Sequence, residues 1–396
     1  MLWMTDATYS RTRPQAVARE LVVLGILPSL FPHGGTPRKL ASVTRHLRER
    51  GIRKVFMVFS DADEGMVDKI TTAGGCVLRT PRRAASDPRL ILDVAGASVR
   101  SRADVVVTHF ARADIYGVLG ACLVGRPVIK EVEGILWSDR GELVACDRLL
   151  GPLRSLVLAN SKAALQAARR RGGVGRAAMV YPGIEDAGPR DPELGRQVRE
   201  ELGIAGRSVV VGHIGGFIAL RRQETLIEAI AMAAREAPQL QLVLIGDGPL
   251  RSSLAHQVHL LGLDENVTML GYRGDVDRLR HAFDVYVNPA EAEGFGLATV
   301  EGMLTGIPVI VADAGASPEV VDDGQTGVIV PAGDSTALAR AIVGLVQCPD
   351  RASAMGQAAR VAALQRFSMD RYADDLERVY RYAAGCRHRR GGTSCG

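Results

Sequence analysis

Aromatic residues are scarce in this chain. Phe, Trp and Tyr make up 5% of its 396 residues, and they form no platform interleaved with the arginines. Proteins that bind single-stranded nucleic acid without sequence preference stack the bases on aromatic side chains along a positively charged groove. The composition therefore predicts that nucleic acid is not a partner.

Long apolar runs are also missing. No stretch reaches the ~18–20 consecutive apolar residues that a membrane-spanning helix needs. The N-terminus lacks the basic segment, apolar core and small-residue cleavage site of a secretory signal. We therefore expect a cytoplasmic protein, either free or peripheral at the inner face of the cell membrane.

The six cysteines are scattered and form no C-x-x-C pair. Most have apolar neighbours, as reduced thiols in a protein core do. Cys386, His388 and Cys395 share a basic, glycine-containing tail, where a metal site is disfavoured. We expect reduced thiols, no metal ion and no other cofactor.

The composition that remains is that of a globular protein, but its charge is uneven. The chain is 47% hydrophobic and 23% charged, and it is long enough for two domains. Residues 1–186 hold 28 Lys and Arg against 18 Asp and Glu, and residues 187–396 hold 21 against 26. A basic first half can attract an acidic acceptor or an anionic membrane. Arginines on solvated faces explain the same count, and both interpretations stay open.

Short apolar runs alternate with amphipathic segments along the whole sequence. This alternation predicts doubly wound parallel sheets, an α/β fold. Strands are predicted at 20–27, 54–60, 76–79, 104–109, 127–132, 156–160, 208–214, 241–245, 267–270, 285–288, 307–312 and 327–330. Helices are predicted at 37–50, 86–99, 113–124, 161–171, 223–236, 249–261, 298–304, 335–347 and 369–383.

Two Rossmann-like domains follow from this pattern. We place a disordered or loosely packed N-terminus at 1–18, a first domain at 19–186 and a second at 187–368. The segment 186–192 is rich in residues that break regular structure and is predicted to link them. A terminal helix at 369–384 and a disordered tail at 385–396 complete the chain.

The most informative stretch is a pair of carboxylates around a glycine turn. Glu293 and Glu301 are separated by seven residues, and Gly294 and Gly296 precede an apolar run that can begin a helix. The start of a helix offers backbone N–H groups and a positive dipole end to an anion. Carboxylates only accept hydrogen bonds, so this pair suits a ligand rich in hydroxyls. Two solvated glutamates are the alternative.

These residues belong to a longer pattern. Glu293-Gly-Phe-Gly and Glu301 are followed by Gly306-x-Pro308-Val, Pro318-Glu319 and Asp323-Gly324-x2-Gly327. The pattern resembles the E-x7-E region of the retaining glycosyltransferases of family 4. The resemblance covers about residues 20–384 and is stronger in the C-terminal half. It implies a GT-B fold, in which two Rossmann-like doubly wound parallel-sheet domains face a central cleft, and in which the terminal helix crosses back to the first domain.

The resemblance also implies roles for the carboxylate region. Glu293 would hold hydroxyls of the donor sugar, and Glu301 the ribose of the nucleotide. Backbone N–H groups of Phe295, Gly296 and Leu297 would bind the diphosphate. Gly34 and Gly35 match the family's glycine loop beside the donor diphosphate, and Gly246 lies in a turn that resembles one in the family's nucleotide-binding half.

Departures from the family pattern concern the phosphate and sugar sites. Arg221 stands where the family has a lysine, but the usual upstream arginine falls on Gly216. Arg222 could supply the second charge, or it is a surface arginine at a helix start. Glu133 takes the place of a histidine that faces the donor sugar, and it could bond a sugar hydroxyl or steady a cationic sugar. His109 ends a strand and either faces the cleft or is a satisfied, partly buried histidine.

Taken together, the resemblance predicts a retaining transferase that moves a hexose-type sugar from a nucleotide diphosphate to an acceptor hydroxyl, without a metal. UDP is favoured over GDP. The acceptor is a glycan, a lipid or a small metabolite. The alternatives are a nucleotide-sugar-binding scaffold with weak turnover, or a phosphorylase or epimerase of the same fold.

Overall fold

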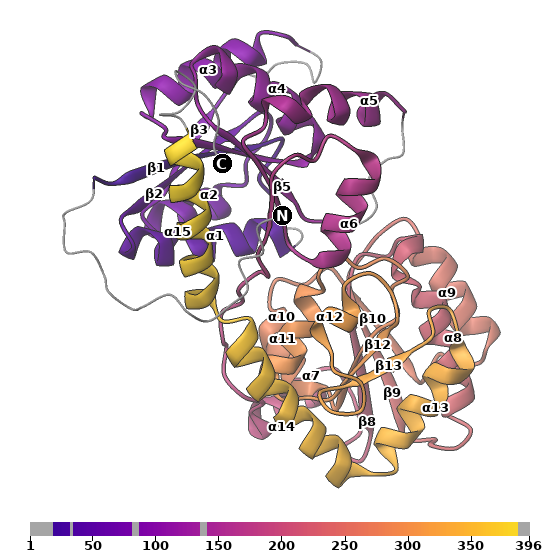
Figure 1. Cartoon of the computed structure of the whole chain (residues 1–396). Coiled ribbons are helices and arrows are strands. Elements are labelled where there is room, and N and C mark those ends of the chain that lie inside the picture. Colours follow the sequence, from indigo (N-terminus) through magenta and orange to yellow (C-terminus); the bar gives the residue numbers. More distant parts are fainter. Residues whose placement is uncertain (1–18, 32–34, 81–86, 135–140, 387–396) are drawn as a thin grey trace. The chain divides into compact units, whose positions relative to one another are not determined.

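The computed structural model describes residues 19–31, 35–80, 87–134 and 141–386 (Figure 1). The chain divides into two compact units. Unit 1 comprises the described residues up to Gly183 and those from Met369 onward, and unit 2 is Ile184–Ser368. The predicted boundaries at 187 and 369 fall within three residues of this division. The predictions for residues 1–18, for Gly34 and for most of the tail lie outside the described residues.

Unit 1 is built on a parallel sheet of seven strands in the order β3-β2-β1-β4-β5-β6-β7. The first strand, β1, lies between β2 and β4, with Leu24 opposite Val55 on one side and Val106 on the other. The strands are β1 (Leu21–Leu27), β2 (Ile52–Val58), β3 (Cys76–Arg79), β4 (Val105–His109), β5 (Val128–Val132), β6 (Leu156–Ala159) and β7 (Ala177–Met179).

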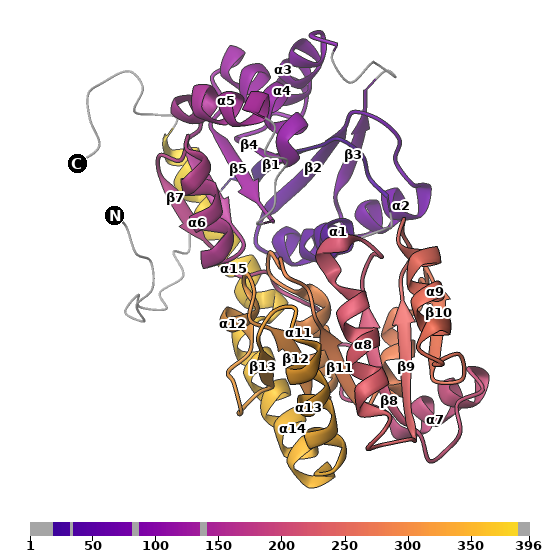
Figure 2. The ribbon, with the colours of Figure 1, turned by 90° about the vertical axis from the view of Figure 1, so that its right-hand side faces the viewer.

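Helices cover both faces of this sheet, which explains why its strands are continuous apolar runs. Alternate residues of each strand point to opposite faces. The face toward α3, which we call the α3 face, carries α3 (Leu90–Arg100), α4 (Phe110–Leu123), α5 (Gly141–Leu150), η1 (Gly151–Leu153) and α6 (Lys162–Arg171). The opposite α15 face carries α1 (Gly35–Glu49), α2 (Glu64–Thr72) and α15 (Met369–Gly385). Figures 1 and 2 show both helix layers.

The last helix belongs to unit 1, although the chain reaches it from unit 2. It buries Met369, Tyr372, Leu376 and Tyr380 at helical spacing against the sheet and α1. Arg50, which directly follows α1, bonds Asp374 at 2.7 Å and fixes the exposed side of this contact. The helix ends at Gly385, two residues beyond its predicted end.

Unit 2 has a second parallel sheet, of six strands in the order β10-β9-β8-β11-β12-β13. The strands are β8 (Val209–Ile214), β9 (Leu240–Ile245), β10 (Val267–Gly271), β11 (Val285–Asn288), β12 (Val309–Ala312) and β13 (Val328–Val330). Its helices are α7 (Pro192–Glu201), η2 (Ala219–Arg221), α8 (Gln223–Ala233), α9 (Arg251–Leu260), α10 (Val276–Leu279), η3 (Arg280–Ala282), α11 (Leu297–Thr305), α12 (Ser317–Val320), α13 (Ser335–Val346) and α14 (Pro349–Arg366). Two parallel, doubly wound sheets confirm the predicted fold class.

Several elements were missed by the sequence prediction. The predicted linker ends in α7, which begins at Pro192 because Asp191 accepts hydrogen bonds from the N–H groups of Glu193 and Leu194. Helix α14 was missed because its buried positions are mostly small, such as Gly356, Ala359 and Ala363, and give little apolar periodicity. Helices α2 and α5 and strand β7 were missed as well.

The cysteines are less buried than the sequence suggests. The five described cysteines, at 76, 122, 146, 348 and 386, are free thiols. Four are partly buried and Cys348 is exposed, so none of these five is a core residue. Among the described helices, none is both long and apolar enough to cross a bilayer.

Lys54 is an unusual core residue of unit 1. It points from β2 to the α15 face, is 1% exposed, and bonds the hydroxyl of Tyr380 at 3.3 Å. Burial lowers its pKa to about 8. In the unfolded chain a lysine keeps a pKa near 10.4. Between these two values the unfolded chain binds more protons than the folded one, so stability rises with pH across that window.

We therefore expect Lys54→Met to stabilise unit 1 by about 1–3 kcal/mol near pH 7, because it removes a buried, poorly compensated ammonium. The rise in stability between about pH 8 and 10 should disappear with it. Urea unfolding followed by circular dichroism at a series of pH values measures this. Lys69→Met, at an exposed position of α2, is the matched control. A loss of stability in Lys54→Met with the pH slope retained would contradict this account.

Candidate active site

The strand order of unit 2 places one pair of strand ends at a switch point. Strands β8 and β11 are neighbours, and the chain continues from them toward opposite edges of the sheet. In sheets of this kind, ligands bind outside the carboxyl ends of the strands at such a point. Arg221 follows β8, in η2, and Glu293 follows β11, in the turn before α11.

Arg221 and Glu293 meet directly. The Nη1 of Arg221 donates to Oε2 of Glu293, and the Nδ2 of Asn288 donates to the same oxygen at 3.0 Å. Glu293 is 8% exposed, whereas the side chain of Arg221 is 33% exposed. A buried carboxylate is therefore held by an arginine that still reaches solvent.

The glycine turn before α11 has the geometry that the sequence suggests. Gly296 is the N-cap of α11 and has φ of 93°, a conformation that favours glycine. A Cβ there would lie 3.4 Å from Cγ of Glu293, so the turn folds closely over this carboxylate. Phe295 is buried edge-on against Phe367, with ring centroids 5.3 Å apart. Gly294 and Leu297 flank these residues, and the first N–H groups of α11 follow the turn.

Glu301 lies in the second turn of α11 and does not contact Glu293. Its Oε2 accepts a hydrogen bond from Nη2 of Arg280 at 2.7 Å. Arg280 is 2% exposed, while the side chain of Glu301 is 20% exposed. A buried arginine thus orients this carboxylate and leaves part of it accessible. The sequence analysis missed Arg280, which lies in a short 3-10 helix without a local motif.

The two other predicted phosphate contacts differ in their surroundings. Arg222 has φ of 50°, and its guanidinium donates to Glu291 and to Glu224. It is therefore held by carboxylates other than Glu293. Gly216 has open space around it, because a Cβ there would meet its nearest atom, the carbonyl oxygen of Asp247, only at 3.8 Å.

Gly246 supports the site through its backbone. It has φ of 146°, and a Cβ at this position would lie 1.9 Å from the carbonyl oxygen of Gly215. The neighbouring Phe217 N–H donates to the carbonyl of Asp247 at 2.9 Å. The turn after β9 is thus locked against the loop after β8, from which Arg221 follows.

Beneath Arg221 lies a buried histidine that the sequence analysis did not single out. The Nδ1–H of His213 donates to the carbonyl of Val287 at 2.9 Å, and Nε2 lies 3.3 Å from the amide nitrogen of Gln223. The contact with a carbonyl fixes the tautomer, so Nε2 is the acceptor. Burial lowers the pKa of His213 to about 4, and the residue is neutral at physiological pH. It joins β8, β11 and the start of α8.

Unit 1 gathers its own predicted residues at the carboxyl ends of β4 and β5. His109 ends β4, Glu131 lies in β5 and Glu133 follows it. Lys39 of α1, which the sequence analysis missed, donates to Oε1 of Glu131 at 3.0 Å and to Oε1 of Glu133. The signal for Lys39 was a charge on the apolar side of the predicted helix 37–50, which indicates a buried lysine but does not identify its partners.

The protonation states of this cluster follow from burial and pairing. Burial alone would raise the pKa of Glu131 and lower that of Lys39, but their mutual attraction outweighs it, so the pKa of Glu131 falls and that of Lys39 rises. Burial lowers the pKa of His109. His109 is 1% exposed, and its Nδ1 lies 3.5 Å from Oε2 of Glu131, although neither ring nitrogen makes a hydrogen bond among the described residues. The histidine is thus fully rather than partly buried, with a carboxylate beside its ring.

Ligand atoms of His109, Glu131 and Glu133 lie within 4.8 Å of one another, a grouping compatible with a cation. The ammonium of Lys39 already contacts both carboxylates and balances their charge. The arrangement thus fits a fixed internal cation better than a bound metal ion. Gly35, the other predicted residue of this unit, begins α1 four residues before Lys39.

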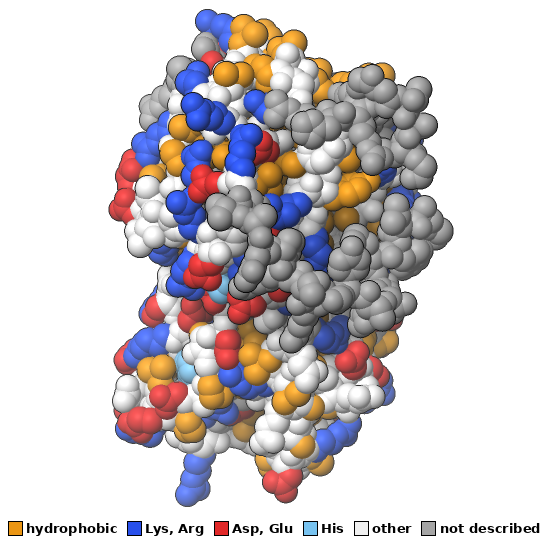
Figure 3. Space-filling model, turned by 60° about the vertical axis from the view of Figure 1, so that its left-hand side comes forward, with side chains coloured by type: hydrophobic (Ala, Val, Ile, Leu, Met, Phe, Trp, Pro, Cys, Tyr) orange, Lys and Arg blue, Asp and Glu red, His pale blue; other side chains and the backbone are white. Residues whose placement is uncertain are grey.

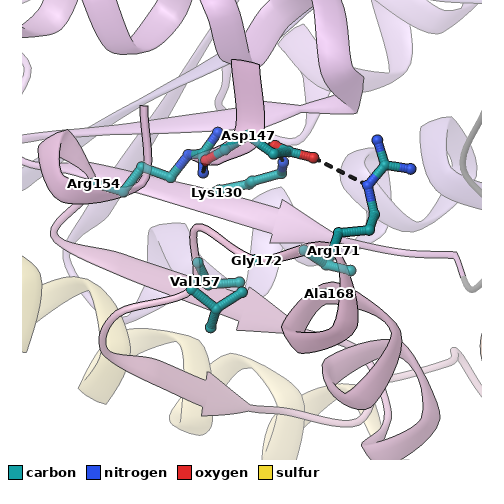
Figure 4. Close-up of a pocket in the computed structure, with 9 residues that line it drawn as sticks. Lys130, Asp147, Arg154, Val157, Ala168, Arg171 and Gly172 are labelled. Atoms are coloured by element: carbon teal, nitrogen blue, oxygen red, sulfur yellow. Dashed lines mark hydrogen bonds and ion pairs between the residues drawn. The ribbon is translucent and has the colours of Figure 1, made fainter. Parts of the chain in front are cut away.

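A second buried charge cluster lies on the α3 face, around a small cavity (Figure 4). Asp147 of α5 accepts hydrogen bonds from Lys130, from Arg154 at 3.1 Å and from Arg171 at 3.2 Å. Arg154 also bonds Asp114 of α4. None of the predicted site residues lines this cavity. The charge cluster beside it connects β5 to the helices that cover this face.

Gly216 and Gly246 have different surroundings, so we expect Gly216→Ala and Gly246→Ala to change the stability of the protein by different amounts. Gly246→Ala should lower the free energy of unfolding by at least about 2 kcal/mol, since the added Cβ overlaps the carbonyl of Gly215 at a backbone conformation that favours glycine. Gly216→Ala should stay within about 0.5 kcal/mol of the wild type. Urea unfolding followed by circular dichroism compares the two, and equal stabilities would show that the loop is not locked as described.

Comparisons with known proteins agree with this architecture. Residues 196–362 match the model of the family described as "Glycosyl transferases group 1". The chain is 29% identical over 184 residues to the N-acetyl-alpha-D-glucosaminyl L-malate synthase of Bacillus anthracis, covering 46% of this chain and 48% of that protein. It is 32% identical over 196 residues to the GDP-mannose-dependent alpha-(1-6)-phosphatidylinositol monomannoside mannosyltransferase of Mycolicibacterium smegmatis, covering 47% and 51%. It thus spans about half the length of these curated relatives.

Structural likeness extends further along the chain. Anabaena HepE, solved in complex with UDP and glucose, superposes with a TM-score of 0.82 at 25% identity, over 91% of this chain and all of that one. Sucrose-phosphate synthase from Thermosynechococcus elongatus gives a TM-score of 0.75 at 18% identity, over 92% of this chain and all of that one. The chain therefore has the GT-B fold, and its C-terminal unit is similar to the glycosyl transferases of group 1.

Proposed function

We propose that this chain is a retaining glycosyltransferase that transfers a hexose-type sugar from a nucleotide diphosphate donor to an acceptor hydroxyl. The observation that carries the proposal is the Arg221–Glu293 pair at the carboxyl ends of β8 and β11. One residue of the pair can hold phosphate, the other can hold sugar hydroxyls, and both lie at the point of the sheet where ligands bind.

In this proposal the leaving diphosphate is stabilised by the chain itself. Breaking the anomeric C–O bond leaves a positively charged sugar and a diphosphate that gains negative charge. Arg221 offers a guanidinium that can contact two phosphate oxygens. The N–H groups of Phe295, Gly296 and Leu297 add the partial positive charge of a helix start. The proposed step uses no metal.

The two carboxylates receive separate tasks. Glu293 accepts hydrogen bonds from the donor sugar, and its fixed position comes from Asn288 and the turn at Gly296. Glu301 accepts from the ribose hydroxyls, and the hydrogen bond from Arg280 orients it. Gly246 serves the backbone geometry of the loop that precedes Arg221.

Residues of unit 1 complete the proposal. Glu133 stands where a related enzyme would present a histidine to the sugar, and Lys39 holds it in place. We propose that Glu133 bonds a sugar hydroxyl, with His109 as its buried neighbour. Gly34 and Gly35 are proposed to lie beside the diphosphate, and the acceptor is a glycan, a lipid or a small metabolite.

The donor is proposed to carry UDP, with GDP second. Anabaena HepE was solved with UDP and glucose, which supports UDP. The Mycolicibacterium relative is named for GDP-mannose, which supports GDP as the second candidate for the donor nucleotide. A cytoplasmic location, with peripheral contact to an anionic membrane, remains part of this proposal.

A scaffold that binds nucleotide sugars without turning them over is the second candidate. Gly216 and Glu133, the two departures from the family pattern, favour it. Slow hydrolysis of a panel of UDP- and GDP-sugars, followed by nucleotide release, separates the two functions and identifies the donor. Arg221→Ala is the matched control and should lose about 10²-fold in rate. Tight nucleotide binding without release from any donor would support the scaffold.

The division of tasks between the carboxylates can be tested separately. Glu301→Ala should weaken UDP binding by about 1–3 kcal/mol, because the ribose loses a charged acceptor. Glu293→Ala should lower turnover without lowering UDP affinity, because Glu293 is assigned to the donor sugar. Calorimetry and the release assay measure the two effects, and Glu291→Ala, at the partner of Arg222, is the control. If both variants bind and turn over like the wild type, the assignment is wrong.

A further inference from the structure

The surface of the α3 face of unit 1 has an unusual composition. Between residues 87 and 155, the exposed side chains among those described are almost all apolar or arginine. Four large aliphatic side chains are more than half exposed: Leu92 at 65%, Val99 at 55%, Leu123 at 64% and Leu149 at 76%. In the described part of unit 1, no other large apolar residue is exposed to this degree.

These side chains lie on neighbouring helices. Leu92 and Val99 are seven residues apart on α3, and therefore share one side of it. Helix α4 packs directly on α3, since a Cβ at Gly120 would lie 2.6 Å from the carbonyl oxygen of Ile91. Leu123 ends α4, and Leu149 lies near the end of α5. Both ribbon views place α3, α4 and α5 together, and Figure 3 shows apolar and basic side chains gathered at the end of the molecule where α3 lies.

The charges on this surface have one sign. The exposed charged residues among the described side chains of 87–155 are Arg89, Arg100, Arg102 and Arg148. None of the described carboxylates of the same segment is fully exposed: Asp114, Glu131 and Asp147 are buried, and Asp87, Asp93, Asp104 and Glu133 are partly buried. Asp114 and Asp147 are bound in the buried cluster with Arg154, and Asp104 accepts a hydrogen bond from the N–H of Val22 at 3.0 Å. Arg89 is paired with Asp87, which leaves Arg100, Arg102 and Arg148 as the main source of positive potential.

Exposure of this kind is unfavourable in water unless something covers it. Each large aliphatic side chain gains about 1.5–3 kcal/mol when it leaves water completely. Contiguous apolar patches on soluble proteins mark sites of interaction. An apolar surface whose exposed charges, among the described residues, are all arginines matches the boundary of an anionic bilayer, where aliphatic side chains enter the acyl region and cations meet lipid phosphates.

We propose that the α3–α4–α5 surface, defined by Leu92, Val99, Leu123 and Leu149 with Arg100, Arg102 and Arg148, docks unit 1 onto an anionic phospholipid membrane. The contact is peripheral. The leucines and the valine insert shallowly, and the arginines bind phosphate groups. An acidic protein partner would match the charges, but the four aliphatic side chains would then require a complementary apolar groove. This surface gives a location for the peripheral membrane contact of the proposed function, and it can be tested without the transferase activity.

Vesicle flotation of the full chain tests this surface. The probes are vesicles of phosphatidylcholine alone and of phosphatidylcholine with phosphatidylglycerol. We expect flotation only with the anionic vesicles, and release at about 0.5 M salt, where the Debye length falls to about 4 Å. The Arg100→Gln/Arg102→Asn variant should bind about thirtyfold more weakly, since each cation near the surface contributes about 1 kcal/mol. Asparagine is chosen at 102 because Arg102 has φ of 57°.

A second variant tests the apolar part. Leu92→Gln/Leu123→Gln should lose flotation while keeping the wild-type circular dichroism spectrum and the affinity for UDP. Leu260→Gln and Arg235→Gln, at exposed positions of unit 2, are the matched controls and should float like the wild type. Wild-type protein that ignores anionic vesicles would overturn the proposal. So would docking variants that float normally, or a lipid-free dimer that Leu92→Gln/Leu123→Gln dissociates, which would make a second copy of the chain the occupant.

Discussion

A parallel sheet that is covered by helices on both faces leaves only the ends of its strands for polar function. This constraint organises unit 2. Strands β8 and β11 lie side by side at the switch point, and the loops that follow them bring Arg221 and Glu293 into contact. Residues of the strands and of the adjoining helix starts support this pair. His213 and Gln223 join β8 to β11 and α8, and Asn288 and the turn at Gly296 hold Glu293. Chemistry at this edge therefore depends on packing several residues away.

Helices also cover both faces of the sheet of unit 1, and charged residues are buried beneath them on each face. Lys130 and Glu131 are neighbours in β5 and point to opposite faces of the sheet, where each meets its own counter-ions. Such pairs are weak evidence for stability, because removal of either partner would leave a charge inside the protein. They do fix geometry. Lys39 ties α1 to the end of β5 and holds Glu133, while Asp147 ties α5 to the opposite face. The two faces are thus locked independently, and the exposed surface of α3, α4 and α5 lies outside both locks.

Much of the fold could be predicted from the sequence, because apolar strands and amphipathic helices alternate with distinct periods. The carboxylate pair and its glycine turn could also be found, since all their residues are local in sequence. Partners that are distant in sequence could not. Nothing near Arg280 indicates that it would bond Glu301 across 21 residues, and nothing near Lys39 indicates two carboxylates more than 90 residues away. Gly216 and Gly246 look alike in sequence, yet one has open space and the other is packed against a carbonyl.

The proposed function requires Arg221 to bind phosphate, yet in the structure this guanidinium is bound by Glu293. We therefore infer that the donor diphosphate replaces the Glu293 carboxylate as the partner of Arg221. UDP carries the diphosphate without the sugar, so calorimetric titration of UDP into Glu293→Gln tests this claim most directly. Removing the charge at 293 frees Arg221 and takes away a carboxylate near the phosphates, so the account predicts tighter UDP binding than in the wild type. Arg221→Ala, measured alongside, should bind UDP more weakly. Weaker UDP binding by Glu293→Gln would contradict the account, since it would make Glu293 a nucleotide ligand rather than the partner that Arg221 must leave.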